Sequence, residues 1–388
     1  MINVAIVGIG NISGAHLSAF QGLSERCKVV ALCDTTPSKA EAKARAVGLD
    51  QVDIVGHHQE LLERDDIHLV SICTPPASHA EITVDSLNAG KNVVVEKPMA
   101  PSLRECDAML EAQANSGKLL SVISQNRFRD DISILKEVTD SGLLGPISHL
   151  HVDSAWWRGV PYYDLHWRGT WASEGGGPTL NHAIHHIDLM LWLMGSPQAV
   201  MAMMTNAWHD NAEVEDLSVA LLRYQRAIAQ LTSSVVHHGE SQQIIIQGRD
   251  ASVAQPWRVH AEDSQPNGFP TPEGNKPLAQ KLEALARDHQ PLQLTGHGGQ
   301  LLDVLDAIDG GTTPNVTGQD GRNTIEVVTA IYRAAIEGAQ VELPIEPSSP
   351  YYSTTGILDN APRYFPKSRS VDHQDGSITV SGSKDRLG

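Results

Sequence analysis

Residues 2–14 read INVAIVGIGNISG, and this stretch decides the fold of the first part of the chain. The β-branched run at 2–7 is typical of a buried strand, and it passes directly into Gly8 and Gly10. A helical pattern follows. Glycines at such a turn let the backbone approach a pyrophosphate closely, and the N-terminus of the next helix offers free N–H groups and a positive dipole end. The stretch therefore predicts a dinucleotide-binding turn.

Two residues refine this prediction. Ser13 stands where the third glycine of G-x-G-x-x-G is expected, with Gly14 one residue later. The second expected strand ends at Asp34, about 20 residues beyond the glycines, where an acid would bind an adenosine ribose. That carboxylate would repel a 2′-phosphate, and Thr35 and Thr36 offer no arginine to receive one, so NAD is favoured over NADP. A doubly wound fold that binds another nucleotide, or none, is the alternative.

Residues 1–125 alternate between short β-branched runs and helical patterns. Strands separated by helices of this length form right-handed βαβ units, so we expect a doubly wound parallel α/β sheet. The expected strands lie at 2–7, 28–33, 52–55, 68–73, 92–95 and 119–123, with helices near 14–24, 38–47, 58–64, 78–89 and 102–116.

The pattern changes near residue 147, where strands follow one another with few helices between them. Such a series predicts a second, α+β domain with a large, mostly antiparallel sheet. The expected strands are 147–155, 198–206, 214–223, 227–237 and 241–247, the helices 180–194, 278–288, 298–309 and 320–337, and a surface excursion covers 255–277. We expect a Rossmann domain at 1–125, a substrate-binding and oligomerisation domain at 126–346, and an arm or tail at 347–388. Within the second domain, helix 320–337 is expected to pack back near the Rossmann domain.

Composition excludes several classes of partner. The 29 Lys and Arg against 46 Asp and Glu give a formal charge of −17, which argues against nucleic acid or an anionic membrane surface as the main partner. A small anionic ligand in a local basic pocket stays possible. The four cysteines form no C-x-x-C pair. A strand that begins at Ile2 leaves no room for a signal peptide, and no run of about 18 apolar residues suggests a membrane span, so we expect a soluble cytoplasmic protein.

Two loops at expected strand ends carry further candidates. Thr74-Pro75, with His79 after it, follows the fourth strand, and Glu96-Lys97-Pro98 follows the fifth. Ligands bind at the carboxyl ends of the strands in an open parallel sheet. Lys97 would point into the same crevice as a nicotinamide, where its pKa could fall and where it could exchange a proton with a substrate oxygen. An ordinary exposed lysine at a strand end is the alternative.

The expected helix 180–194 concentrates histidines. Asn181, His185 and Asp188 stand at i, i+4 and i+7, on one helix face, and His182 and His186 form a second pair. Paired histidines can bind zinc, but no further ligand pattern completes a set, so we expect no metal. Solvent-exposed histidines on an amphipathic helix are another possibility. We predict general acid/base chemistry by a histidine that a neighbour orients.

An aromatic segment precedes this helix. Four of the seven tryptophans lie between residues 156 and 171, beside arginines and tyrosines. Rings next to Arg and His donors suit a polyhydroxylated sugar ring, although a core or interface cluster would look the same. The candidate substrate contacts are Arg127, Arg158, Tyr163, Trp167, Arg168, His182 and His185.

In combination these motifs resemble the Gfo/Idh/MocA oxidoreductases, such as glucose–fructose oxidoreductase and inositol dehydrogenase. The resemblance covers about residues 2–344. Its matching pieces are Gly8-x-Gly10 with His16, Asp34, Thr74-Pro75 with His79, Glu96-Lys97-Pro98, Gln125-Asn126-Arg127, Gly175-Gly176-Gly177, His185-x-x-Asp188 and Gly318-x-Asp320-Gly321.

The resemblance implies hydride transfer between a nicotinamide and a carbon of a sugar, glycoside or polyol such as a cyclitol. It implies that Lys97 and His185 are the catalytic lysine and histidine, with Asn181 where many relatives carry Asp, as in nucleotide-sugar and glycoside 3-dehydrogenases. Asn181 and Asp188 would orient the histidine. An open sheet would pair in a homodimer or homotetramer. The implied cofactor contacts are Gly8, Gly10, Asn11, Ile12, Asp34, Thr74, Pro75, His79, Glu96, Lys97 and Asn126.

Two alternatives to a simple dehydrogenase stay open. Some relatives oxidise a sugar only transiently, for elimination or glycoside cleavage, and then return the hydride, so that no net NADH accumulates. A non-enzymatic NAD(H) sensor on the same fold is the other alternative, although the presence of both Lys97 and His185 argues against it. A nucleotide sugar would need a basic diphosphate site, and because only Arg158 and Arg168 are nearby, a free sugar or simple glycoside is favoured.

Overall fold

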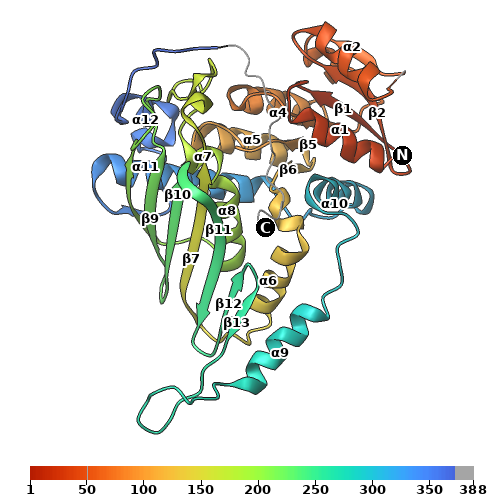
Figure 1. Cartoon of the computed structure of the whole chain (residues 1–388). Coiled ribbons are helices and arrows are strands. Elements are labelled where there is room, and N and C mark those ends of the chain that lie inside the picture. The colour runs from red at the N-terminus through yellow and green to blue at the C-terminus, as the bar shows by residue number, and fades with distance from the viewer. Residues whose placement is uncertain (50, 372–388) are drawn as a thin grey trace.

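The computed structural model describes residues 1–49 and 51–371 and contains two sheets that lie next to one another (Figure 1). The first sheet is parallel, with the strand order β3-β2-β1-β4-β5-β6, which confirms the doubly wound prediction. Its strands are β1 (Ile2–Val7), β2 (Cys27–Cys33), β3 (Asp53–Val55), β4 (Leu69–Ile72), β5 (Asn92–Val95) and β6 (Leu120–Val122), and its helices are α1 (Ser13–Gly22), α2 (Pro37–Ala46), α3 (Gln59–Leu62), α4 (His79–Asn88) and α5 (Leu103–Ser116). The order reverses between β1 and β4, which places the ligand crevice at the ends of these two strands.

The second sheet has the order β13-β12-β11-β7-β10-β9-β8-β14 and is antiparallel except where β7 meets β10. This confirms the expected second architecture. Its strands are β7 (Ile147–Trp157), β8 (Ala199–Thr205), β9 (Leu217–Arg223), β10 (Ile228–Ser234), β11 (Val236–Gly248), β12 (Ser252–Gln255), β13 (Arg258–His260) and β14 (Val341–Glu342). Further helices are α6 (Asp130–Asp140), α8 (Ile184–Met194), α9 (Lys276–Arg287), α10 (Gly296–Gly310) and α11 (Gly318–Glu337), with the 3₁₀ turns η1 (Pro76–Ser78), η2 (Gln125–Phe128) and η3 (Val160–Asp164).

Two late helices return to the parallel sheet. α10 packs on α1, and its Leu301, Val304 and Leu305 belong to the same buried cluster as Leu17 and Phe20 of α1. α11 contacts α5 and β6 on one side and α8 and β8 on the other. The parallel sheet therefore packs against helices from the later part of the chain as well as its own (Figure 1).

The single helix predicted at 180–194 is wrong. The structure has α7 (Pro178–Asn181) and α8 (Ile184–Met194), separated at His182 and Ala183. The backbone N–H groups of His182 and Ala183 both donate to the carbonyl of Pro178, so the helical hydrogen-bond ladder is broken there. The i, i+4 relation assumed between residues 181 and 185 therefore does not hold.

The C-terminal segment is more regular than an arm or tail. After residue 347 the chain forms a 3₁₀ turn, η4 (Pro350–Tyr352), and a helix, α12 (Thr354–Asn360), and then runs extended to Val371. The remainder of the predicted tail, residues 372–388, lies outside the described residues. The expected surface excursion at 255–277 contains β13, which the sequence pattern did not indicate. None of the described helices combines the length and the apolar character needed to cross a membrane.

The two glycines of the first turn make different demands, which a pair of variants can separate. Gly8 has φ +91°, and a Cβ there would lie 2.7 Å from the backbone nitrogen of Thr74, whereas a Cβ on Gly10 meets nothing within 4 Å. We expect Gly8→Ala to lower the free energy of unfolding by about 2 kcal/mol or more, from backbone strain and overlap, and Gly10→Ala to leave it nearly unchanged. Urea unfolding of both variants measures this. Equal stability of the two variants would contradict the described geometry of the turn.

Candidate active site

The glycine turn suits the pyrophosphate of a dinucleotide. α1 begins at Ser13 with no side-chain cap and no acidic residue in its first turn, and Gly10 and Asn11 before it are exposed. An uncapped helix N-terminus beside an open glycine is a binding place for a phosphate group. Ser13 is fully buried, and its Oγ donates to the carbonyl of Gly10 at 2.7 Å. The residue that replaces the third glycine thus closes the turn from inside.

Asp34 is held where a ribose would lie. Its Oδ2 accepts the N–H of Ile9 at 2.9 Å and its Oδ1 accepts the N–H of Thr36 at 2.8 Å. These bonds join the end of β2 to the glycine turn. An ionised carboxylate has about four acceptor sites, so Asp34 keeps sites for ribose hydroxyls.

His79 is placed differently from the prediction. It is completely buried, and its Nε2 and Nδ1 lie 2.8 Å and 2.9 Å from the carbonyl oxygens of Thr74 and Pro98. Burial lowers its pKa. A ring closed off in this way joins two loops and has no surface for a cofactor, so we no longer include His79 among the cofactor contacts. Thr74 and Pro75 stay accessible at the strand end.

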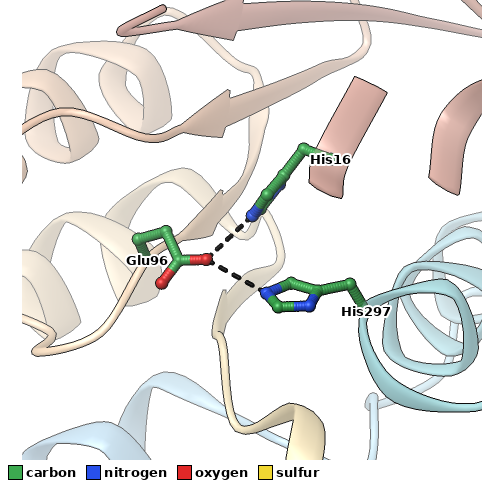
Figure 2. Close-up of side chains that lie close together, drawn as sticks. All are labelled: His16, Glu96 and His297. Carbon is green, nitrogen blue, oxygen red and sulfur yellow. Dashed lines mark hydrogen bonds and ion pairs between the residues drawn. The ribbon is translucent and has the colours of Figure 1, made fainter. Parts of the chain in front are cut away.

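Glu96 is the centre of a buried polar cluster, shown in Figure 2. Its Oε1 lies 2.9 Å from Nε2 of His16, on α1, and 3.3 Å from Nε2 of His297, on α10. The other nitrogen of His16 lies 2.8 Å from Oγ of Ser71, on β4, and Glu96 Oε2 accepts the N–H of Lys97 at 3.1 Å. Burial opposes ionisation of this carboxyl, but the two histidines hold the pKa of Glu96 well below its usual range.

This cluster changes the expected role of Glu96. With 4 % of its surface exposed and both oxygens engaged, Glu96 holds the end of β5 rather than presenting a carboxylate to a cofactor. The sequence motifs include His16 but predict no partner for it. Nothing in the sequence pattern indicates His297, which lies 201 residues from Glu96. Among the described residues, His16, Glu96 and His297 form one group of converging potential metal ligands and His58, Glu81 and Asp85 form the other; His182 and His186 belong to neither.

Lys97 and His185 line the same small cavity. Apolar and small residues complete its wall: Met99, Val122, Ile123, Ser124, Ile184, Gly321 and Thr324. Lys97 Nζ donates to the carbonyl of Asn181 at 3.2 Å. Burial lowers the pKa of Lys97, and the positive charge of Arg168 acts in the same direction. The negative charge of Glu96 acts in the opposite direction. Burial and the charge of Lys97 place the pKa of His185 well below its usual value. The surroundings of both groups therefore disfavour the protonated form relative to the same side chain in water.

The side chains expected to orient His185 have other partners. Asn181 Nδ2 donates to the carbonyls of Gly176 and Gly177 at 2.8 and 3.3 Å. Asp188 is buried, and both of its oxygens accept from Arg127. Within the described part of the chain neither side chain is hydrogen-bonded to His185. The break at 182–183 directs the Asn181 side chain to its own turn, and the expected orienting role of both residues stays a prediction.

Arg127 is held by two carboxylates. Its Nε and Nη2 lie 2.9 and 2.7 Å from the two carboxylate oxygens of Asp188, and Nη2 lies 3.2 Å from Asp320 on α11. The guanidinium is 3 % exposed. These partners occupy the guanidinium, so in this structure Arg127 joins η2, α8 and α11.

Glu215 holds the N-terminal end of α7 in place. Its carboxylate accepts the N–H groups of Gly177 and Thr179 at 3.0 and 3.2 Å and the hydroxyl of Tyr332 at 3.0 Å. A Cβ on Gly177 would lie 1.8 Å from the carbonyl oxygen of Glu215, and one on Gly176 would lie within 2.1 Å of the Tyr332 hydroxyl. The glycine run is therefore needed for close packing. Sequence analysis missed Glu215 because it lies in a strand region that carries no motif.

The aromatic segment surrounds Arg168. Its guanidinium lies 4.2 Å from the ring centre of Tyr162 and 4.1 Å from that of Trp167, and its Nη1 lies 2.7 Å from Oε1 of the buried Glu174. Arg158 lies over Trp156 at 5.4 Å. Arg158 also lies over Tyr162, at 5.8 Å, so Arg158, Trp167 and Arg168 gather around the ring of Tyr162.

His182 and the two tyrosines complete this side of the site. His182 lies 5.8 Å from the ring of Trp156 and 6.0 Å from that of Tyr162, and its Nδ1 has no partner among the described residues. Burial, followed by Arg158 and Lys97, lowers its pKa well below the usual value. Tyr163 is 1 % exposed and packs on His209, whereas the ring of Tyr162 lies beside Arg168 and His182.

A second hollow lies apart from these residues, between the end of α8 and the turn after β9. It is lined by Leu193, Met194, Gln198, Tyr224 and Arg226 and contains none of the predicted site residues. It lies away from the strand-end loops of the parallel sheet, where ligands of this fold class bind. The crevice that holds Lys97 and His185 is therefore the better candidate.

Comparison with known proteins identifies the family of both halves of the chain. The GFO_IDH_MocA model, an oxidoreductase family with an NAD-binding Rossmann fold, matches residues 2–124, and the GFO/IDH/MocA C-terminal domain matches residues 132–254. The expectation of an NAD-binding Rossmann fold is thereby confirmed.

Individual relatives are more distant. The chain is 30 % identical over 268 residues to a 1-carboxy-3-chloro-3,4-dihydroxycyclohexa-1,5-diene dehydrogenase of Comamonas testosteroni, covering 66 % of this chain and 64 % of that one. It is 29 % identical over 196 residues to the D-glucoside 3-dehydrogenase of Escherichia coli, covering 50 % and 55 %. The match thus spans between half and two thirds of the length of these two proteins. The WlbA dehydrogenase of Bordetella pertussis, solved with NADH and UDP-GlcNAcA, superposes with a TM-score of 0.75 at 26 % identity, over 89 % of this chain and 99 % of that one.

The Glu215 carboxyl makes the free energy of unfolding depend on pH, and its raised pKa determines the direction of that dependence. Burial raises its pKa to about 7, so the folded chain holds this proton more tightly than the unfolded chain, whose glutamates titrate near pH ~4.3. The stabilisation is complete below the unfolded value and is lost as the pH rises to about 7.

We therefore compare the free energy of unfolding of the natural chain and of Glu215→Gln, by urea denaturation at pH 5 and pH 8. Between these pH values the natural chain should lose about 2 to 3 kcal/mol more than the variant, which cannot ionise at this position. Parallel pH profiles for the two proteins would show that Glu215 does not titrate in this range.

Proposed function

The chain belongs to the Gfo/Idh/MocA oxidoreductase family, and on that premise we propose that it is an NAD-dependent dehydrogenase of a sugar, glycoside or cyclitol. Lys97 and His185 form its acid/base pair. The observation that carries this proposal is that the two side chains line one cavity at the carboxyl edge of the parallel sheet, each with a lowered pKa. A neutral amine and a neutral imidazole each have a lone pair for a hydroxyl proton.

The residues around Lys97 prepare it for this task. The Nζ of Lys97 donates to the carbonyl of Asn181, which holds the end of the side chain at the wall of the cavity. The carboxylate of Glu96, directly before Lys97, accepts the main-chain N–H of Lys97 and so fixes the main chain at this point. When Lys97 takes up a proton, the carboxylates of Glu96 and Glu174 stabilise the positive charge. NAD, when bound, supplies the acceptor for the hydride that leaves the substrate carbon as its hydroxyl becomes a carbonyl.

The aromatic side of the crevice supports a sugar ring as the substrate. Trp167 is 40 % exposed and can stack on the C–H face of a sugar, next to the fixed guanidinium of Arg168. His182 offers a nitrogen without a protein partner in the described structure, which can bond a sugar hydroxyl. Asp34 favours NAD over NADP, since its carboxylate would lie against a 2′-phosphate.

The outer face of the second sheet supports a homodimer or homotetramer. Five apolar side chains there are 40–80 % exposed: Met201, Met203, Val219, Leu221 and Ile228. The pairing of β8 with β9 sets Met201 beside Leu221 and Met203 beside Val219, so these four side chains form one apolar patch. A patch of this kind on a flat sheet fits the same patch of a second copy around a two-fold axis.

The proposal is tested by NADH formation. Purified protein is given NAD with free sugars, cyclitols, glycosides and nucleotide sugars, and the same panel is repeated with NADP. We expect turnover with NAD and one substrate class, much less with NADP, and a loss in kcat of about 10²–10⁴-fold in Lys97→Met and in His185→Asn. Both variants should keep their affinity for NADH in fluorescence titration, because neither side chain carries the pyrophosphate or ribose contacts.

Two other results would replace the proposal. Substrate consumed without NADH formation would indicate transient oxidation with internal return of the hydride. NADH binding with no conversion of any compound would indicate a sensor. Turnover unaffected by Lys97→Met would remove this residue from the acid/base pair.

The oligomer is tested separately by light scattering on a sizing column. Met203 is the most exposed member of the patch, at 80 %. Met203→Asp should therefore leave the fold of one copy intact while it places a charge in the interface. We expect the variant to run as a smaller species than the natural chain. Phe269→Asp, at a 68 % exposed position in the loop before α9, serves as the matched control and should leave the mass unchanged.

A further inference from the structure

The last described residues pack against the loop that carries the candidate sugar contacts. We call residues 362–371 the C-terminal strap and residues 158–171 the substrate loop. The strap returns to the loop through main-chain bonds: Val371 N–H donates to the carbonyl of Asp164 at 2.7 Å, and His166 N–H donates to the carbonyl of Val371 at 3.0 Å. At the other end, Trp171 Nε1 donates to the carbonyl of Pro362 at 2.9 Å.

Lys367 binds the centre of the substrate loop. Its Nζ donates to the main-chain carbonyls of Tyr163 and Leu165, the latter at 2.8 Å. The carbonyl of Leu165 also accepts the N–H of Arg168 at 3.0 Å. One carbonyl therefore connects the strap lysine to the turn from which the Arg168 side chain leaves the backbone.

Asn211 fastens the strap to the body of the second sheet. It lies in the connection between β8 and β9 and is 1 % exposed. Its Oδ1 accepts the N–H groups of Ser368 and Arg369 at 2.8 and 2.9 Å, and its Nδ2 donates to Oδ1 of Asp164 at 2.8 Å. One amide side chain thus joins strap, loop and sheet. Arg369 adds an ion pair with Asp210 at 2.9 Å.

The substrate loop needs such support. Apart from η3 it has no regular structure, and a segment outside helices and sheets keeps one conformation only through side-chain and loop contacts. Arg168, moreover, must hold its guanidinium between two rings and against Glu174. A small shift of residues 163–166 would move Trp167 and Arg168 together.

We propose that the C-terminal strap fixes the substrate loop in its sugar-binding conformation, with Lys367 and Asn211 as positioning residues that determine affinity for the substrate. This inference rests on the proposed function for the identity of the ligand. It assigns a task to a segment that the family motifs, which end near residue 344, do not include. The strap touches the substrate loop and not the glycine turn, so it acts on the sugar and not on NAD.

The experiment compares point variants and truncations in the full chain. Lys367→Met keeps the length and apolar stem of the side chain but removes the donors. We expect the KM for the sugar to rise about tenfold, the effect of one hydrogen bond to a charged group, with kcat within about threefold and NADH affinity unchanged. Lys281→Met, at an exposed position on α9, is the matched control and should change none of these.

Truncation separates the strap from the residues after it. A chain that ends at Ala361 should show at least the KM increase of Lys367→Met, whereas a chain that ends at Val371 should keep the natural KM. Hydrogen–deuterium exchange gives a readout that needs no turnover: amides of residues 160–171 should exchange faster in Lys367→Met and in the shorter chain, while those of β1 and α1 stay protected.

The outcomes distinguish the two proposals. Natural turnover with an unchanged KM and unchanged loop exchange in Lys367→Met would overturn the strap. A general fall in thermal stability, kcat and NADH affinity, without a selective change in KM, would show a purely structural role and overturn it as well. If the natural chain converts no sugar, the proposed function fails. Faster exchange confined to the substrate loop in Lys367→Met would in that case still show that the strap holds the loop in place.

Discussion

The buried carboxylate of Glu96 is the constraint on which the crevice depends. A charge removed from water is tolerated only when it is paired and hydrogen-bonded, and here the partners come from α1, α10 and the main chain of Lys97. His16 in turn reaches Ser71 on β4. Four segments far apart in sequence must therefore meet before this charge is satisfied. The lysine proposed for proton transfer is the next residue, so its position is set by the same bonds.

The opposite wall of the crevice is built on a second buried carboxylate. Glu215 collects the N–H groups at the start of α7 and the hydroxyl of Tyr332 on α11, and only glycines at 176 and 177 allow this approach. The break after α7 then directs the carbonyl of Asn181 towards Lys97 while α8 brings His185 into the same cavity. Each half of the proposed acid/base pair is thus positioned by a carboxylate that does not itself face the cavity.

The parallel half of the fold could be predicted because its signals are local. The strand-to-helix alternation, the glycine turn and Asp34 each lie within a short stretch, and Ser13 replaces the third glycine by a bond to its own turn. The structure differs from the sequence expectations where a role depends on distant partners. Arg127 lies beside a family motif, but Asp188 and Asp320 take up its guanidinium. His79 is closed off by two carbonyls, and Asn181 lost its helix-face relation to His185 at a break that periodicity does not reveal. His297, Glu215 and Lys367 carry no local pattern, and only the tertiary structure brings them to the site.

The packing of α10 has a consequence for the order in which the chain becomes stable during synthesis. Leu301, Val304 and Leu305 complete the apolar layer over Leu17 and Phe20, and His297 supplies the second partner of Glu96. When the ribosome has made only the first six strands, that layer is open to water and the buried charge has one histidine. The nucleotide-binding half therefore cannot reach its final stability as a nascent domain. It reaches that stability only after α10 has been made, and until then it exposes apolar surface of the kind that chaperones cover.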